Sequence, residues 1–167
     1  TVQEFGAKGD GVADETAAFQ KALNAMAAAG GGTVFAPEGQ YRFAGSLVIP
    51  QSVTLRGEWK APTHQDRSVA GTILMPTAGK GNADGRAFIQ LEGSTGIRDL
   101  SIWYPEQNAS QPIPYPFTLE QLLGNNATFK NLTLVNPYLG IKIGPDFNEL
   151  HYIHHVYGSP PKDWYSL

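Results

Sequence analysis

The chain has 167 residues, of which 41% are hydrophobic and 16% are charged, so it is long enough for one folded domain and too apolar to be disordered. Its formal net charge is only -3, which argues against nucleic acid as a partner, and the absence of cysteine excludes disulfides and thiolate metal sites. No stretch approaches the roughly 20 apolar residues of a membrane span, so no membrane partner is expected either.

The first 32 residues predict a short strand, a glycine-rich turn and one helix. The turn is centred on Gly9-Asp10-Gly11, and Asp14 is the expected N-cap of a helix that extends to Ala29. Apolar residues recur along this helix at i, i+3, i+4 and i+7, which gives it one buried stripe. The stripe consists of Phe19, Ala22, Leu23 and Met26. Three glycines from Gly30 onward then end the helix.

Residues 33–158 consist of short apolar runs separated by turns. Two of these runs, which begin at Ile97 and Phe129, read apolar, basic, short polar, apolar, and a third, which begins at Ile153, follows the pattern more loosely with histidines. Each is preceded by a further strand-like run, and a turn that contains glycine separates the two. A repeat of this kind, at a spacing of roughly 20 to 35 residues, is typical of a solenoid coil.

Three polar, turn-rich segments interrupt the repeat. They cover residues 59–70, 78–85 and 105–116. In solenoids, such insertions tend to emerge on one face, and that face is often the binding face. We therefore expect excursions from the coil rather than linkers between domains.

Two segments of the chain, FGAKGDGVADETAAFQKAL from Phe5 and GGGTVFAPEGQY from Gly30, resemble the N-terminal signature of the pectate-lyase-like superfamily. This group includes polygalacturonase-type hydrolases, β-1,3-glucanases and phage tailspikes. The resemblance implies an all-β fold, a right-handed single-stranded parallel β-helix whose first open end is capped by the N-terminal α-helix. The repeats would supply about five coils, after which the fold would be truncated.

In such a fold, equivalent residues of successive coils stack about 4.8 Å apart and form rows. Two apolar rows and one polar row are predicted: Ile97, Phe129 and Ile153; Leu100, Leu132 and Val156; and Asp99, Asn131 and His155. The polar row could be a carboxylate and imidazole site. We favour a structural ladder of side chains that bond the turn backbone, because asparagine at turns does this routinely.

We expect one β-helix domain over residues 1–167. It would comprise the strand and capping helix (1–32), the coils (33–158) and a tail (159–167) that does not continue the repeat. A frame change or a truncation of a longer gene would explain such a tail. The last coil would then expose apolar rows and strand edges, and self-association through this open C-terminal end would cover them, giving a homo-oligomer.

Cleavage of a polysaccharide by hydrolysis needs two carboxylates, and elimination needs a base and a cation to neutralise the uronate. The hallmark motifs of polygalacturonases and pectate lyases are absent. The densest titratable cluster follows the last clear strand, and its candidates for catalysis are Asp146, Glu149 and His154, with His151 and His155 nearby. A solvated turn is the simpler interpretation of this cluster. No metal ligand spacing is present, and neither a metal nor another cofactor is expected.

Four aromatic residues follow strands or lie in excursions, where their rings could stack on sugar faces. They are Trp103, Tyr104, Tyr115 and Tyr138. Aromatic residues at such positions also fill the ends of solenoids, so both roles stay open.

These features lead to two hypotheses. The first is the N-terminal portion of a secreted, carbohydrate-active β-helix protein related to polysaccharide hydrolases or lyases, with little or no activity alone and a polysaccharide or oligosaccharide as its partner. The alternative is a non-catalytic carbohydrate-binding or tailspike-like structural module. If the chain is an enzyme, it is a polysaccharide-degrading glycosidase or lyase.

Overall fold

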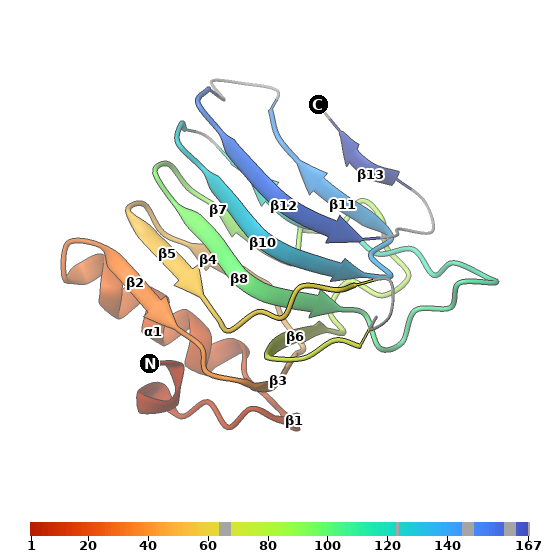
Figure 1. Cartoon of the computed structure of the whole chain (residues 1–167), viewed down its shortest axis with the longest axis horizontal. Coiled ribbons are helices and arrows are strands. Elements are labelled where there is room, and N and C mark those ends of the chain that lie inside the picture. The colour runs from red at the N-terminus through yellow and green to blue at the C-terminus, as the bar shows by residue number, and fades with distance from the viewer. Residues whose placement is uncertain (64–67, 123, 145–148, 159–162, 167) are drawn as a thin grey trace.

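A computed structural model describes residues 1–63, 68–122, 124–144, 149–158 and 163–166, which are mainly strands (Figure 1). This part of the chain contains a 3-10 helix, η1 (Val2–Phe5), and an α-helix, α1 (Thr16–Ala28). Neither helix has the length and apolar character that crossing a membrane requires. The strands are β1 (Asp10–Asp14), β2 (Gly32–Phe35), β3 (Gly39–Phe43), β4 (Leu47–Ile49), β5 (Val53–Arg56), β6 (Thr72–Pro76), β7 (Ile89–Leu91), β8 (Gly96–Trp103), β9 (Phe117–Gln121), β10 (Thr128–Val135), β11 (Leu139–Lys142), β12 (Tyr152–Gly158) and β13 (Asp163–Ser166).

The strands form two parallel sheets. The first has the order β1-β3-β6-β8-β10-β12, with β5 also paired to β8 and β2 paired to β5. The second has the order β13-β11-β9-β7-β4. From β7 onward the chain alternates between the sheets, so each pass lies beside the pass before it, as the colour gradient in Figure 1 shows. Parallel neighbours joined in this way are the arrangement of a parallel β-helix, which confirms the expected fold at this level.

The strand register confirms the apolar rows predicted from the repeat. The rows are Ile97–Phe129–Ile153 and Leu100–Leu132–Val156, each running across β8, β10 and β12. The members in β8 and β10 are fully buried, whereas Ile153 in β12 is 50% exposed. Successive side chains of a strand point to opposite faces of the sheet. Because these apolar side chains point into the core, the polar side chains next to them point outward.

The polar row of Asp99, Asn131 and His155 lies where the three strands bend. All three residues have positive φ, at 58°, 52° and 51°, in the left-handed region that Asp and Asn enter more easily than most residues. Asn131 Nδ2 donates to Asp99 Oδ1 at 2.6 Å, and His155 Nδ1 lies 3.2 Å from Asn131 Oδ1. A ladder therefore forms, but its side chains bond one another rather than the turn backbone. Because a carboxylate only accepts hydrogen bonds, the amide nitrogen of Asn131 must face Asp99. The amide oxygen of Asn131 therefore faces His155, and His155 Nδ1 is the donor in that bond.

The core contains a group of aromatic rings that joins α1 to the strands. Phe19 packs edge-to-face on Tyr41 and on Phe43, with ring centroids 5.0 Å apart in each pair. Phe43 in turn packs on Phe88 at 5.2 Å. Edge-to-face pairs of this kind stabilise a core beyond the area that they bury. They fix α1 beside the N-terminal strands, where Figure 1 shows it.

The start of α1 differs from the prediction by one residue. The N-cap is Glu15 rather than Asp14, although Asp14 Oδ1 accepts hydrogen bonds from Thr16 N at 3.1 Å and from Thr16 Oγ1 at 2.6 Å. The Glu15 side chain turns inward and is 2% exposed. Its Oε1 accepts the backbone N–H groups of Lys8 and Gly9 at 2.9 and 3.2 Å. These bonds hold the glycine-rich turn against the helix and satisfy the buried carboxylate.

Part of the tail, which was predicted not to continue the repeat, lies within the described residues. Asp163–Ser166 form β13, which pairs in parallel with β11 and places Tyr165 beside Ile141. Pairing needs only backbone groups and an open strand edge, so a segment without the repeat pattern can still add a strand. The described parts of the three polar excursions lie between strands, after β5, β6 and β8.

Candidate functional site

A row of polar side chains lies on the outer face of the second sheet. Gln90 in β7, Glu120 in β9 and Lys142 in β11 are neighbours in register. Each follows a buried apolar residue in its strand, so the alternation of the strand directs the polar side chain away from the core. The coil thus brings together three residues that are far apart in the sequence.

Hydrogen bonds connect this row from end to end. Arg86 Nε donates to Gln90 Oε1 at 2.6 Å, and Gln90 Nε2 donates to Glu120 Oε2 at 2.8 Å. Lys142 Nζ donates to Glu120 Oε1, also at 2.8 Å. Each carboxylate oxygen of Glu120 therefore has its own donor, and the Glu120 side chain is only 17% exposed.

The surroundings of Glu120 act on its pKa in opposite directions. Burial raises the pKa, but the hydrogen bonds from Lys142 and Gln90, with the positive charges of Lys142 and Arg86, outweigh burial and hold the pKa of this carboxyl below its usual value. Glu120 is therefore ionised at neutral pH and matched by Lys142. A carboxylate held in this way is a poor proton acceptor, so its effect is to fix the position of the Lys142 ammonium group.

A hollow of about 210 Å³ opens beside the row. Its lining comes from the segment before β7 and from β9 and β11: Ala83, Asp84, Gly85, Ala87, Phe117, Glu120 and Lys142. Lys142 Nζ also lies 6.0 Å from the centre of the Phe117 ring. The hollow thus combines a cation, an aromatic ring and two carboxylates. A cation can bind an acid group, and an aromatic ring can pack on the apolar face of a sugar.

The cluster predicted as catalytic is not assembled into one site in the described residues. Asp146 lies outside them. Glu149 is exposed, whereas His154 lies in β12 of the first sheet, where its ring stacks on Tyr152 with centroids 5.6 Å apart. No hydrogen bond or ion pair joins Glu149 to His154 in the part of the chain that the structure describes. Within the same ranges, no group of three His, Asp or Glu side chains is placed to hold a metal ion.

Two of the four aromatic residues predicted to stack on sugars are core residues. Tyr104 is 2% exposed and Tyr115 is fully buried, and their rings pack edge-to-face with centroids 4.9 Å apart. Tyr104 also shares a hydrogen bond with Thr118 Oγ1 at 3.0 Å. Their ring faces are covered by the chain itself, so neither can receive a sugar. Trp103 and Tyr138 are only partly buried.

The polar row of the second sheet was not singled out from the sequence. One signal was present, because Gln90, Glu120 and Lys142 each stand after an apolar residue in a predicted strand. Yet 30 residues separate Gln90 from Glu120 and only 22 separate Glu120 from Lys142. Excursions of different length obscure the row, and only the strand register reveals it.

Comparisons with known proteins agree with this fold. Residues 1–93 match the family model described as rhamnogalacturonase A/epimerase, pectate lyase-like. Mannuronan C5-epimerase AlgE5 of Azotobacter vinelandii is 61% identical in an alignment of 106 positions that covers 56% of this chain and 11% of that protein. Alginate lyase 7 of the same organism is 34% identical in an alignment of 106 positions that covers 56% of this chain and 12% of that protein. The chain thus spans little more than a tenth of the length of these two relatives.

A solved structure extends the likeness to nearly the whole chain. The A-module of mannuronan C-5 epimerase AlgE6 from Azotobacter vinelandii has a TM-score of 0.68, with 23% identity over 95% of this chain and 44% of that chain. The family match covers more than half of the chain and includes both segments that carry the N-terminal signature, so the resemblance is confirmed. The chain belongs to the rhamnogalacturonase A/epimerase, pectate lyase-like family.

Proposed function

We propose that this chain is the N-terminal portion of a carbohydrate-active β-helix protein, and that the hollow on its second sheet binds an acidic sugar of a polysaccharide. The names of two relatives specify mannuronan and alginate, which are uronate polymers with a carboxylate on every sugar. A polymer of this kind is met outside the cell, so we also propose that the protein is secreted.

The observation that carries this proposal is the position of Lys142. Its side chain is 38% exposed, its ammonium group lines the hollow, and Glu120 holds it in place. A uronate carboxylate could bind the face of this ammonium group that Glu120 leaves free. The Phe117 ring, next to Lys142 in the lining, would then pack against the C–H face of the same sugar.

The same geometry supports little or no turnover by the chain alone. Epimerisation at C5 and cleavage by elimination both begin with removal of the proton on the carbon next to the uronate carboxylate. That step needs a base with a free lone pair as well as a cation. Both oxygens of Glu120 accept hydrogen bonds and its pKa is lowered, so it is poorly suited to be that base.

Calorimetric titration and a turnover assay on mannuronan, alginate, pectate and a β-glucan would test this proposal. We expect saturable binding of the uronate polymers, no turnover, and weaker binding by Lys142→Gln. Lys80→Gln is the matched control, because Lys80 pairs with Glu106 at 2.6 Å outside the hollow. Unchanged binding by Lys142→Gln would contradict the proposal. Turnover abolished by Glu149→Gln would instead restore the catalytic role predicted from the sequence.

The alternative is a non-catalytic carbohydrate-binding or tailspike-like module. The fully paired Glu120 carboxylate favours it, because a site without a free base has no evident acid–base chemistry. This alternative predicts equally strong binding of uncharged glycans, since nothing in it depends on a uronate carboxylate. Preference for uronate polymers in the same titrations would count against it.

We further propose a right-handed coil of about five turns, with α1 closing its N-terminal end and a second copy covering the start of β12. The support for self-association is the exposure of Tyr152 and Ile153, 50% each. Apolar side chains exposed together on one strand favour contact with a partner. Analytical ultracentrifugation at high micromolar concentration should detect dimers, and a strict monomer would contradict this proposal.

A further inference from the structure

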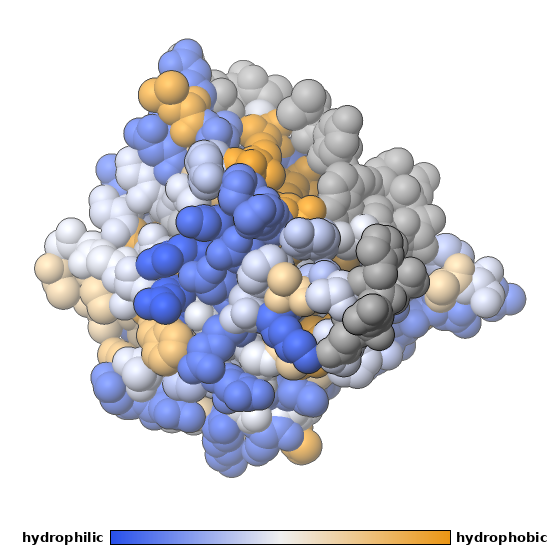
Figure 2. All heavy atoms as spheres, in the orientation of Figure 1, coloured by the Kyte–Doolittle hydropathy of each residue, from blue (hydrophilic) through white to orange (hydrophobic). Residues whose placement is uncertain are grey.

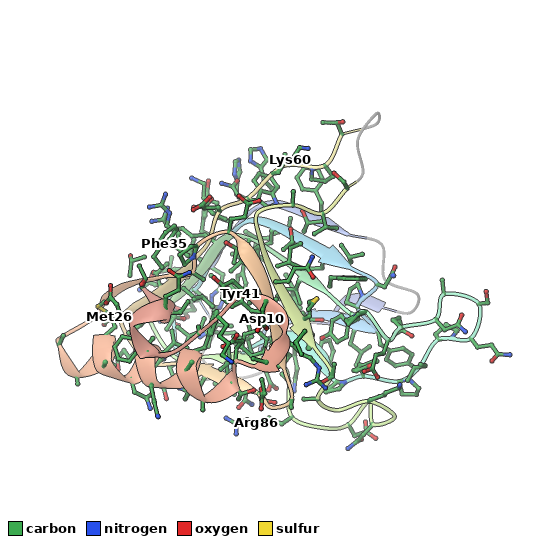
Figure 3. The ribbon with its side chains drawn as sticks, turned by 90° about the horizontal axis from the view of Figure 1, so that it is seen from below. Asp10, Met26, Phe35, Tyr41, Lys60 and Arg86 are labelled. Atoms are coloured by element: carbon green, nitrogen blue, oxygen red, sulfur yellow. The ribbon has the colours of Figure 1, made fainter. Side chains whose placement is uncertain are left out.

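A row of cations crosses the outer face of the first sheet, away from the hollow. Five adjacent strands place Phe35, Arg56, Arg98, Lys130 and His154 in one register row. Neighbours in this row are separated by the strand spacing of about 4.8 Å. In the view of Figure 3, Phe35 and Lys60 lie on the upper side of the molecule, and Arg86, in the segment before β7 of the second sheet, lies on the lower side. The row and the hollow therefore occupy opposite faces.

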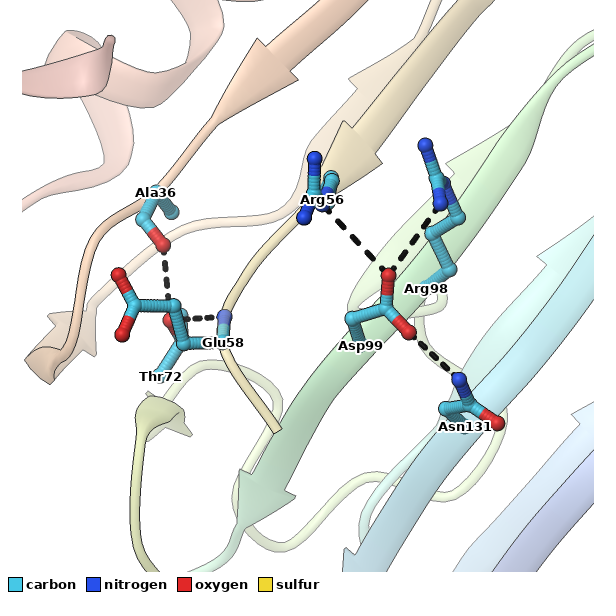
Figure 4. Close-up of polar contacts among 7 residues, drawn as sticks. All are labelled: Ala36, Arg56, Glu58, Thr72, Arg98, Asp99 and Asn131. Carbon is cyan, nitrogen blue, oxygen red and sulfur yellow. Dashed lines mark hydrogen bonds and ion pairs between the residues drawn. The ribbon is translucent and has the colours of Figure 1, made fainter. Parts of the chain in front are cut away.

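The positive charge of this row is only partly balanced. Asp99 Oδ2 lies 3.3 Å from Arg98 Nη1 and 3.6 Å from Arg56 Nε, so one carboxylate serves two guanidinium groups (Figure 4). Lys130 makes no ion pair within the described residues. Like charges directly opposite one another on neighbouring strands are destabilising, so folding stability does not explain this alignment. An anionic ligand would complete its charge balance.

The ladder behind the row fixes the geometry of the cations. Asp99 is 19% exposed and is held by Asn131 Nδ2 at 2.6 Å. It therefore holds Arg56 and Arg98 side by side, while their side chains stay 49% and 37% exposed to solvent. Figure 2 shows the result as a hydrophilic band across the sheet. Cations that are fixed before binding lose less conformational entropy when an anion arrives.

An aromatic edge accompanies the charged row. Trp59 Nε1 donates to Thr133 Oγ1 at 2.9 Å, and the Trp59 ring lies 5.9 Å from the ring of Tyr157. Thr133 and Tyr157 are register neighbours, three positions beyond Lys130 and His154 in their strands. The Trp59 segment is anchored at its base, because Thr72 Oγ1 accepts the Glu58 N–H at 2.8 Å and donates to Ala36 O at 2.7 Å (Figure 4).

We propose that this face, Arg56, Arg98 and Lys130 with the Trp59–Tyr157 edge, binds an acidic polysaccharide chain that runs across the strands. Cations at the strand spacing suit a polymer with a carboxylate on each sugar, and the aromatic edge suits the apolar faces of its rings. The choice of a uronate polymer rests on the proposed function.

Affinity electrophoresis in gels that contain alginate would test this inference. The main variant combines Arg98→Gln with Lys130→Gln. Lys130→Gln is also tested alone, because it breaks no ion pair of the described residues and so should leave folding undisturbed. We expect the double variant to bind alginate about tenfold more weakly and with less sensitivity to salt. Lys80→Gln should migrate as the wild type does, and thermal unfolding should show that each variant is folded.

The outcomes separate this inference from the proposed function. Loss of alginate binding in the double variant, with Lys142→Gln unchanged, supports the cationic face and contradicts the hollow. Loss only in Lys142→Gln supports the hollow and overturns the inference. Wild-type binding to a neutral β-glucan that equals binding to alginate, no alginate binding at all, or stronger retardation by single-stranded DNA than by alginate would each overturn it too.

Discussion

The two outer faces of the coil treat charge in different ways. On the second sheet, Glu120 and Lys142 stand side by side and each neutralises the other. On the first sheet, Arg56 and Arg98 share the single carboxylate of Asp99, and Lys130 next to them has no described ionic partner. Both faces are built by the same parallel register. The register thus decides which residues meet, and the residue types decide whether a row is complete in itself or open to a ligand.

The largest expected effect removes the core that both faces share. Phe129 is fully buried in β10, directly before Lys130. Phe129→Ala should cost about 3–5 kcal/mol of unfolding free energy, because it deletes a buried ring and leaves a cavity. Urea unfolding would measure this, with Phe5→Ala as the control, since Phe5 is 38% exposed. A loss below about 1 kcal/mol would show that the β10 row is not part of a continuous core.

The next largest effect is expected from removing the Glu120–Lys142 ion pair on the second sheet. Glu120→Gln removes the carboxylate between Gln90 and Lys142, so a charged hydrogen bond and an ion pair are lost. Because Lys142 is partly exposed, we expect a loss of about 1–2 kcal/mol. Alginate binding by the cationic face should not change. A variant as stable as the wild type would mean that this ion pair does not stabilise the fold.

The pH dependence of stability gives a further test of the Glu120–Lys142 pair. The pKa of Glu120 is lower in the folded chain than in the unfolded chain. Its contribution to stability is therefore complete above the unfolded value of about 4.3 and is lost as the pH falls through the folded pKa. Asp10 and Asp14 also have lowered pKa values, so the informative quantity is the difference between wild type and Glu120→Gln. That difference in unfolding free energy should shrink on acidification, and a constant difference would contradict this account.

A smaller effect on stability is expected from removing the charge of Asp99, which makes the cationic row of the first sheet more positive. Asp99→Asn keeps the hydrogen bond from Asn131 but removes the charge between Arg56 and Arg98. Because both arginines are more than one third exposed, the loss of stability should be about 1 kcal/mol or less. Binding of alginate should become stronger and more sensitive to salt. Weaker binding by a folded Asp99→Asn would show that the ladder, not the net charge, controls this face.

The smallest expected effect lies outside both faces. Lys80 and Glu106 form an exposed pair at 2.6 Å, with side chains 46% and 41% exposed. Lys80→Gln should change the unfolding free energy by about 0.5 kcal/mol or less, because solvent screens such pairs. Thermal unfolding would confirm that this variant is a sound control for the binding experiments. A larger loss would disqualify it.

The repeat in the sequence was sufficient to predict the rows of β8, β10 and β12. Apolar residues at fixed positions around Asp99, Asn131 and His155 predicted both the inward rows and the polar ladder. That success has a physical reason, because the inward residues must recur wherever parallel strands stack in register. The predicted ladder was wrong in one detail, because its side chains bond one another rather than the turn backbone.

The candidate site was not predictable in the same way. Aligning Gln90, Glu120 and Lys142 requires the lengths of the excursions between them, which follow no period. The burial of Tyr104 and Tyr115 depends on how the excursion after β8 folds back, which hydropathy does not encode. β13 adds a strand at the edge of β11, although its sequence does not follow the repeat.

Two-dimensional amide NMR of the chain with an oligomannuronate, compared with a neutral β-glucan oligomer, would observe both faces at once. We expect the mannuronate to shift the amides around Arg98 and Lys130 and, separately, those around Glu120 and Lys142. Added salt should reduce the first set more strongly, and the neutral oligomer should shift neither. Unchanged amides at Arg98 and Lys130, or the same shifts with the neutral oligomer, would contradict the claim that the row of Arg56, Arg98 and Lys130 binds an acidic polysaccharide.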